Sequence, residues 1–264
     1  MTIVVAALLI FSIIMVHELG HAFMMRQYGV AIKEICLLGL GPKLASFKWP
    51  KVFGQTLLTV RLVPLGAFVK PESSLEESVT PQRLEHIFAA GIAANFVYAG
   101  ILALVYTPLA CRYEPHMMTE IMLAMPLVIL FCIGIGVAMW KFPTFANWVV
   151  ITIGMLALAF LVYVFVRVPF WKALGGPITI GSEIASIESY RRGVDFAFIM
   201  SINLLVVNAL PLPPLDGGNI LLSLLKRKQP ILMQRYGTPL ELVLVLGALT
   251  FIVLALGSDI MSLF

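Results

Sequence analysis

Residues 17–21, His17-Glu18-Leu19-Gly20-His21, decide how this sequence is read. They lie near the end of the apolar stretch 2–25, TIVVAALLIFSIIMVHELGHAFMM, which is long enough to cross a bilayer as a helix. Residues four apart share one face of a helix, so both imidazoles can bind one metal ion. Glu18 can then take a proton from a water that zinc activates.

The alternative is a chance match, and the apolar context argues against it. A carboxylate inside a transmembrane helix costs roughly 2.5–3.5 kcal/mol on insertion scales, and such residues usually pair, ligate or catalyse. The stretch 2–25 has neither a basic leading segment nor a small-residue cleavage site, so we expect a retained helix rather than a signal peptide. The pattern predicts a catalytic site with one zinc ion, His17 and His21 as ligands and Glu18 as base.

The composition is typical of a protein with lipid as its solvent. The 264 residues are 60% hydrophobic and 12% charged, with a mean hydropathy of +0.99, whereas soluble domains are about 25% charged. The net charge is +4, but no basic helix or basic–aromatic cluster indicates a nucleic-acid partner. The cysteines, Cys36, Cys111 and Cys132, indicate neither a disulfide framework nor a cysteine zinc site.

Apolar stretches long enough to span a bilayer recur along the chain. They are about 2–25, 87–110, 119–140, 148–167, 194–214 and 239–258. Most of the 18 Lys and Arg residues fall in connections on one side of such a six-span arrangement, namely 26–86, 141–147 and the segment between the last two spans. The positive-inside rule places that side in the cytoplasm and both termini outside.

Segment 33–70 differs from the apolar stretches. Its run Gln55–Val63 is rich in Val, Leu and Thr, and Pro64-Leu65-Gly66 ends it, which predicts one or two β-hairpins at the membrane interface or against the protein. We therefore expect an all-α polytopic membrane protein of about six transmembrane helices, with a small membrane-associated β-hairpin segment. It forms a single domain, 1–264, in three parts: 1–110, an extra helical hairpin at 111–168, and 169–264.

A catalytic zinc usually takes three protein ligands. The candidates for the third are the acidic and histidine residues in or beside other spans: Glu85, His86, His116, Glu120, Asp195, Asp216, Glu241 and Asp259. Asp216 lies at the cytoplasmic end of stretch 194–214, the same depth as His17 and His21. Pro211-Leu212-Pro213-Pro214 should break that helix just before it. Its predicted depth in the membrane therefore favours Asp216 as the third ligand. The non-functional alternative is an ordinary charged residue in an Asp-Gly turn at the membrane interface.

Amides inside the apolar stretches form a second group of candidates. They are Asn95, in Ala90-Gly91-Ile92-Ala93-Ala94-Asn95, and Asn203 and Asn208 in stretch 194–214. Such amides often only join helices by hydrogen bonds. The functional alternative is that they bind substrate, by donating to the carbonyl oxyanion or by holding the substrate backbone.

Together these motifs resemble the site-2 protease family, in particular its bacterial regulator-of-sigma-E type. The resemblance rests on the His-Glu-x-x-His motif, Gly91-x-x-x-Asn95, and Asn208 through Gly218, with supporting stretches at 39–42, 63–70 and 176–180. It implies an intramembrane zinc metalloprotease in which His17, His21 and Asp216 hold zinc and Glu18 is the base. It also implies that segment 33–70 receives substrate as an added strand.

The same resemblance implies substrates, location and two departures. Single-span membrane proteins or signal-peptide-like segments would be cut within the bacterial inner membrane, with the active site toward the cytoplasmic side. The family usually has proline after Gly91, where this chain has Ile92. Sigma-E-type relatives carry PDZ domains where residues 111–168 predict a helical hairpin.

Two other functions compete with this interpretation. A zinc transporter or metal chaperone should show paired repeats with broken helices in matching positions, and only the segment Pro211–Pro214 suggests one. A catalytically dead scaffold of the protease family would normally have lost His17, Glu18, His21 or Asp216, and all four are present.

Overall fold

The structure, a computed structural model, describes residues 2–48, 56–63, 66–113, 118–167 and 190–261. The helices are α1 (Thr2–Gln27), α3 (Leu75–Ser78), α4 (Pro81–Tyr113), α5 (Met118–Lys141), α6 (Pro143–Arg167), α9 (Tyr190–Ala209), α10 (Asp216–Lys228) and α11 (Pro230–Met261). The strands are β1 (Ile32–Leu38), β2 (Leu40–Lys48), β3 (Leu57–Val63) and β4 (Phe68–Pro71). Each of the six predicted apolar stretches falls largely on one long helix.

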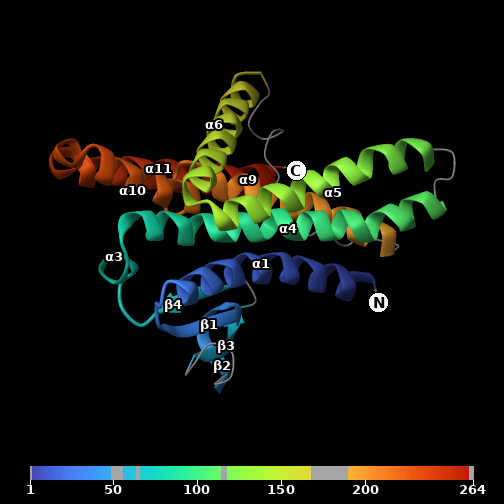
Figure 1. Ribbon diagram of the computed structural model, residues 1–264, viewed down its shortest axis with the longest axis horizontal. Helices are drawn as coiled ribbons and strands as arrows, with labels where there is room; N and C mark the ends of the chain where they lie inside the picture. Colours follow the sequence, from blue (N-terminus) through green and yellow to red (C-terminus); the bar gives the residue numbers. More distant parts are fainter. Residues whose placement is uncertain (1, 49–55, 64–65, 114–117, 168–189, 262–264) are drawn as a thin grey trace.

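Helix α4 is the centre of the helical part. It packs against α1, α5, α6, α9 and α10, and α5 runs along it (Figure 1). Its small and apolar residues form the main core with α5, α6, α9 and α10, including the fully buried Ile92, Met139 and Val150. The Gly91–Asn95 segment is continuous helix, because Ile92 keeps the backbone N–H that a proline would lack.

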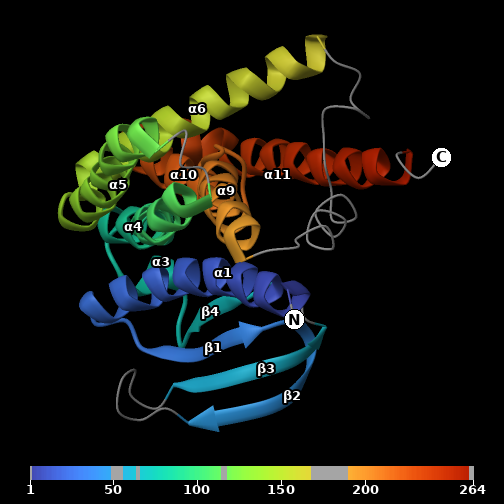
Figure 2. The ribbon, with the colours of Figure 1, turned by 90° about the vertical axis from the view of Figure 1, so that its right-hand side faces the viewer.

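Helix α1 lies between the sheet and the other helices. Figure 2 shows the strands on one side of α1, with α4 and α9 on the other. The contact is apolar: Ile35 of β1 and Met24 of α1 are fully buried, and Leu58 and Val69 pack on the same cluster. This arrangement brings the end strand β4 beside the C-terminal half of the helix that carries the histidines.

The sheet is larger and more mixed than a pair of hairpins. Its order is β2-β3-β1-β4, and β2 and β3 pair in the antiparallel manner of the predicted hairpin. β1 and β3, however, are parallel, and β4 pairs antiparallel with the other side of β1. The physical reason is burial of one apolar face: α1 packs on β1 and β4, and Leu58 of β3 joins the same apolar cluster.

Several of the helices have the length and composition of membrane spans. Within the described residues, three helices are long and apolar enough to cross a bilayer: Pro81–Pro108, Met122–Lys141 and Pro143–Phe160. Helix α5 exposes large apolar side chains such as Leu123, Leu127 and Leu130. Helix α6 crosses the direction of α4 and α5 steeply in both views (Figures 1 and 2). Six membrane crossings therefore stay a prediction.

The helix ends where the prolines at 211–214 predict a break. Helix α9 ends at Ala209, and α10 begins at Asp216, so the aspartate opens a new helix instead of closing the old one. Gly217 makes this tight connection possible, since a Cβ there would lie 2.2 Å from the carbonyl oxygen of Ala209. Residues 118–167, the region of the predicted extra hairpin, are two helices joined at Phe142.

Candidate metal centre

Three side chains from two distant helices meet at one point. His17 and His21 lie one turn apart on α1, and Asp216 reaches them from the first turn of α10. The two histidine Nε2 atoms are 3.1 Å apart. Asp216 Oδ2 lies 3.1 Å from His17 Nε2 and 3.3 Å from His21 Nε2. All three residues are buried.

This triangle has the dimensions of a zinc ligand set. Ligand atoms at 2.0–2.1 Å from a tetrahedral zinc ion are about 3.3 Å from one another. Two imidazoles and a carboxylate are also a donor set that zinc uses in catalytic sites, where the fourth position stays open. Asp216 Oδ2 accepts no hydrogen bond from the described residues, which suits an atom that coordinates a cation. The residues present therefore fit the metal that the motif predicts.

The outer nitrogen of His21 is held by the backbone of α4. Nδ1 lies 2.7 Å from the carbonyl oxygen of Ile87. A carbonyl only accepts, so Nδ1 of His21 donates and the neutral ring keeps its lone pair on Nε2. That is the tautomer which a metal ligand at Nε2 requires.

The outer nitrogen of His17 faces the amide of Asn95. The two nitrogens, Asn95 Nδ2 and His17 Nδ1, are 3.2 Å apart, and Asn95 is fully buried. Asn95 Oδ1 has no hydrogen-bond partner among the described residues. Rotation of this amide by 180° lets Oδ1 accept from His17 Nδ1. The free Nδ2 donor would then lie at the edge of the metal centre.

Gly91 lets α4 approach the two imidazoles. A Cβ at this position would lie 2.4 Å from His21 Nε2 and 2.7 Å from Cε1 of His17. No real side chain fits at these distances, so the site requires glycine here. Sequence reasoning named Gly91 only as part of a motif. The close approach became visible only from the packing of α4 on α1.

Glu18 lies beside the three-residue group without belonging to it. Its carboxylate accepts a hydrogen bond from the backbone N–H of Val69 in β4. This contact connects the predicted base to an end strand of the sheet. Val69 lies within the stretch 63–70 that supports the family resemblance, but a backbone contact of this kind leaves no signature in a sequence.

The other candidate ligands lie elsewhere. Glu85 is paired with Arg227, and His86 contacts Tyr28 and the carbonyl oxygen of Met139. Glu241 is exposed on α11. His116 lies outside the described residues, as do the side chains of Glu120, Asp195 and Asp259.

The remaining asparagines do not reach the ligand triangle. Asn203 is exposed and Asn208 is half-buried on α9, and within the described residues neither makes a hydrogen bond to His17, His21 or Asp216. The three cysteines are free, as expected.

With this geometry established, comparison with known proteins decides the family. Residues 5–249 match peptidase family M50. The chain belongs to this family. The match covers nearly the whole sequence and confirms the site-2 protease relationship that the motifs indicated. M50 proteins of this kind are membrane-embedded, which agrees with the apolar helices α4, α5 and α6.

Curated relatives carry consistent names. The chain is 39% identical over 71 residues to the zinc metalloprotease RasP of Bacillus licheniformis, which is 26% of this chain and 16% of the relative. It is 38% identical over 68 residues to the regulator of sigma-W protease RasP of Bacillus subtilis, or 25% and 15% of the two chains. The zinc metalloprotease RasP of Oceanobacillus iheyensis is 34% identical over 88 residues, or 33% and 20%. These matches span a fifth or less of each relative's length.

Proposed function

We propose that this M50 chain is a zinc metalloprotease that hydrolyses peptide bonds in or near transmembrane segments. The observation that carries the proposal is the triangle of His17 Nε2, His21 Nε2 and Asp216 Oδ2, with sides of 3.1–3.3 Å and Glu18 beside it. When bound there, zinc supplies a Lewis acid that polarises the scissile carbonyl and lowers the pKa of water toward about 7. The names of the RasP relatives support zinc as the ion.

Glu18 is the proposed general base. It follows His17 directly, so it lies beside the ligands while its carboxylate stays outside the ligand set. The Val69 N–H faces that carboxylate from the side of the sheet. A base placed in this way can take the proton from the attacking water and pass it to the leaving amine.

The sheet is the proposed substrate platform. A helical substrate hides its peptide bonds, so its backbone must unwind before hydrolysis. β4 is an end strand that pairs with β1 on one side only, among the described strands, and Val69 of β4 contacts Glu18. An extended peptide added along β4 would gain backbone hydrogen bonds and lie next to the base.

The asparagines divide into two proposed roles. With its amide rotated so that Oδ1 accepts from His17 Nδ1, Asn95 can orient the ligand while Nδ2 donates to a substrate carbonyl. Asn208 and Asn203 lie on α9 away from the ligand triangle. Any contact that they make with substrate would be along its backbone, farther from the reacting bond.

The proposed substrates are single-span membrane proteins or signal-peptide-like segments. The regulator of sigma-W name of the Bacillus subtilis relative supports a membrane-anchored regulatory protein as one such substrate. By the positive-inside rule the ligand triangle lies toward the cytoplasmic face of the cell membrane.

A reconstituted cleavage assay tests this function. The purified full chain is placed in liposomes with a single-span substrate protein, and mass spectrometry maps the cut. We expect cleavage in or beside the span by the wild type, and none by Glu18→Gln, which should still bind zinc. The matched control is Glu241→Gln, an exposed carboxylate on α11, which should cut at the wild-type rate. Cleavage by Glu18→Gln at that same rate would refute the mechanism.

A further inference from the structure

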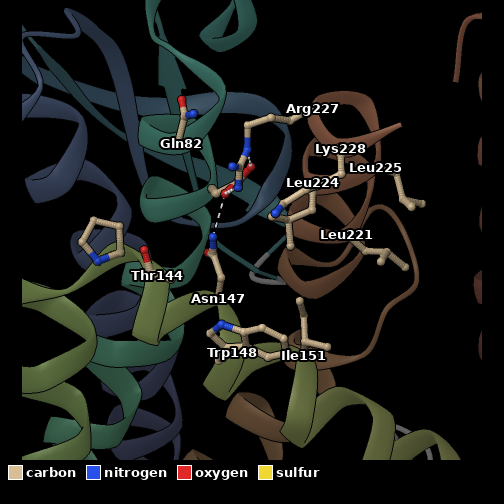
Figure 3. A pocket seen from close by; sticks show the side chains of 12 residues that line it. Gln82, Thr144, Asn147, Trp148, Ile151, Leu221, Leu224, Leu225, Arg227 and Lys228 are labelled. Carbon is tan, nitrogen blue, oxygen red and sulfur yellow. Dashed lines mark hydrogen bonds and ion pairs between the residues drawn. The ribbon is translucent and has the colours of Figure 1, made fainter. Parts of the chain in front are cut away.

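A second cavity lies away from the ligand triangle. It has a volume of about 410 Å³ and opens between the first turns of α4, the first turns of α6 and the second half of α10 (Figure 3). One wall is apolar and includes Trp148, Ile151 and Leu221. The other side is polar and contains Glu85, Asn147, Arg227 and Lys228, the last three of which are labelled in Figure 3. The M50 chemistry uses none of these residues.

Glu85 and Arg227 form the base of the polar side and neutralise each other. Glu85 is fully buried, and its two oxygens accept from Arg227 Nε at 3.1 Å and Arg227 Nη2 at 3.0 Å. Asn147 Nδ2 also donates to Glu85, at 2.6 Å, and Ser223 Oγ donates at 3.3 Å. The carboxylate therefore has its full set of donors and needs no ligand.

Asn147 lines this cavity and carries a buried acceptor that is left unused. It is only 7% exposed, and its Nδ2 is committed to the Glu85 carboxylate, which fixes which way round the amide lies. Its Oδ1 has no hydrogen-bond partner among the described residues. A buried acceptor without a partner is unfavourable, so a bound group that donates a hydrogen bond would be favoured here.

Lys228 supplies an uncompensated positive charge at the same opening. Its neighbours Lys226 and Arg227 are paired with Glu76 and Glu85, whereas Lys228 has no ion pair within the described part of the chain. It is exposed and lines the cavity. With Arg227 neutralised by Glu85, the net charge of the polar side is positive, and this selects an anionic ligand over a zwitterionic one.

We propose that this cavity binds an anionic phospholipid with a hydroxyl-bearing headgroup, such as phosphatidylglycerol. The phosphate pairs with Lys228, a headgroup hydroxyl donates to Asn147 Oδ1, and an acyl chain lies on Trp148 and Ile151. Basic pockets between membrane helices bind anionic headgroups in this way. The lipid would join α6 to α10, and α10 begins with Asp216. Lipid binding in this cavity does not depend on proteolysis.

Native mass spectrometry of the purified, delipidated full chain tests the site. Lipid occupancy is measured with phosphatidylglycerol, with zwitterionic phosphatidylcholine, and with phosphatidylmethanol, which keeps the phosphate charge but lacks the hydroxyls. The wild type should bind phosphatidylglycerol most tightly. Lys228→Gln should weaken that binding about fivefold, since one lysine near a membrane surface contributes about 1 kcal/mol.

Lys226→Gln is the matched control, because it removes the same charge from the same helix outside this cavity. It should leave the affinity for phosphatidylglycerol unchanged. The proposal is overturned if phosphatidylcholine binds equally well, or if the two lysine variants have equal effects. Equal binding of phosphatidylmethanol and phosphatidylglycerol would reject the contact with Asn147.

Discussion

At the scale of single residues, the two histidines of the M50 motif are held by different groups. His21 Nδ1 meets a backbone carbonyl, which any residue at position 87 would supply, whereas His17 Nδ1 meets the side chain of Asn95. The His-Glu-x-x-His spacing could be read from the sequence because it is local. These supporting contacts could not, because Ile87 and Asn95 lie 66 and 78 residues from the histidines that they hold.

Asn95→Ala should therefore weaken zinc binding, because His17 would lose the group that orients its ring. Removal of an outer partner of a ligand histidine typically costs 10–100-fold in metal affinity. Competition with a chelator of known affinity measures the change. Asn208→Ala, which removes an amide away from the triangle, should leave zinc affinity unaltered. If both variants keep wild-type zinc affinity, Asn95 does not orient His17.

Gly91→Ala should also disturb zinc binding, through steric contact instead of a lost hydrogen bond. Its Cβ would lie 2.4 Å from His21 Nε2, so the ring or helix α4 must move. We expect at least a tenfold loss of zinc affinity. Gly134→Ala on α5 is the control, because a Cβ there meets nothing within 4 Å. Unchanged zinc affinity in Gly91→Ala would show that α4 does not approach the histidines this closely.

At the scale of elements, the long helices could be predicted and some connections could not. Runs of about twenty apolar residues are a strong local signal, and the prolines at 211–214 marked the break after α9. Helix α10 was not predicted, because its opening Asp216-Gly217-Gly218 is typical of a turn. The contacts that stabilise α10 come from residues far away in the sequence: Arg227 pairs with Glu85, 142 residues away. The parallel pairing of β1 with β3 likewise depends on distant packing, because Leu58 of β3 joins the apolar cluster of Ile35 and Met24.

The sheet offers a test through pH. Glu34 of β1 is buried, which would raise its pKa, but hydrogen bonds from Thr59, Arg61 and Lys43 outweigh burial and lower the pKa to about 2. The ordinary value is 4.5. The ionised carboxylate therefore stabilises the sheet above about pH 4.5, and this stabilisation is lost as pH falls toward 2.

Glu34→Gln should accordingly lower the hydrogen-exchange protection of β1 and β3 amides at neutral pH, by about 1–3 kcal/mol in opening free energy. The difference from the wild type should shrink steadily between pH 4.5 and 2. Glu72→Gln, an exposed carboxylate just after β4, should match the wild type throughout. A difference that stays constant over this pH range would show that the charge of Glu34 is not what stabilises the sheet.

At the scale of the whole molecule, the six-span topology predicts which connections face the cytoplasm. Helices α5 and α6 meet at Phe142 and diverge, and the positive-inside rule places this connection in the cytoplasm. In a variant without the three native cysteines, a cysteine at Thr144 should react with membrane-impermeant thiol reagents from the cytoplasmic face. A cysteine at Lys172 should react from the opposite face. Labelling of position 144 from outside would overturn the six-span arrangement.

The central claim is a zinc ion held by His17, His21 and Asp216, and metal analysis of the purified protein tests it most directly. We predict one zinc per chain for the wild type and for Glu241→Gln, and a large loss of zinc for Asp216→Asn. The loss follows because a neutral amide is a poorer ligand than a carboxylate for this cation. Full zinc content in Asp216→Asn, or an active wild-type protein without zinc, would contradict the claim.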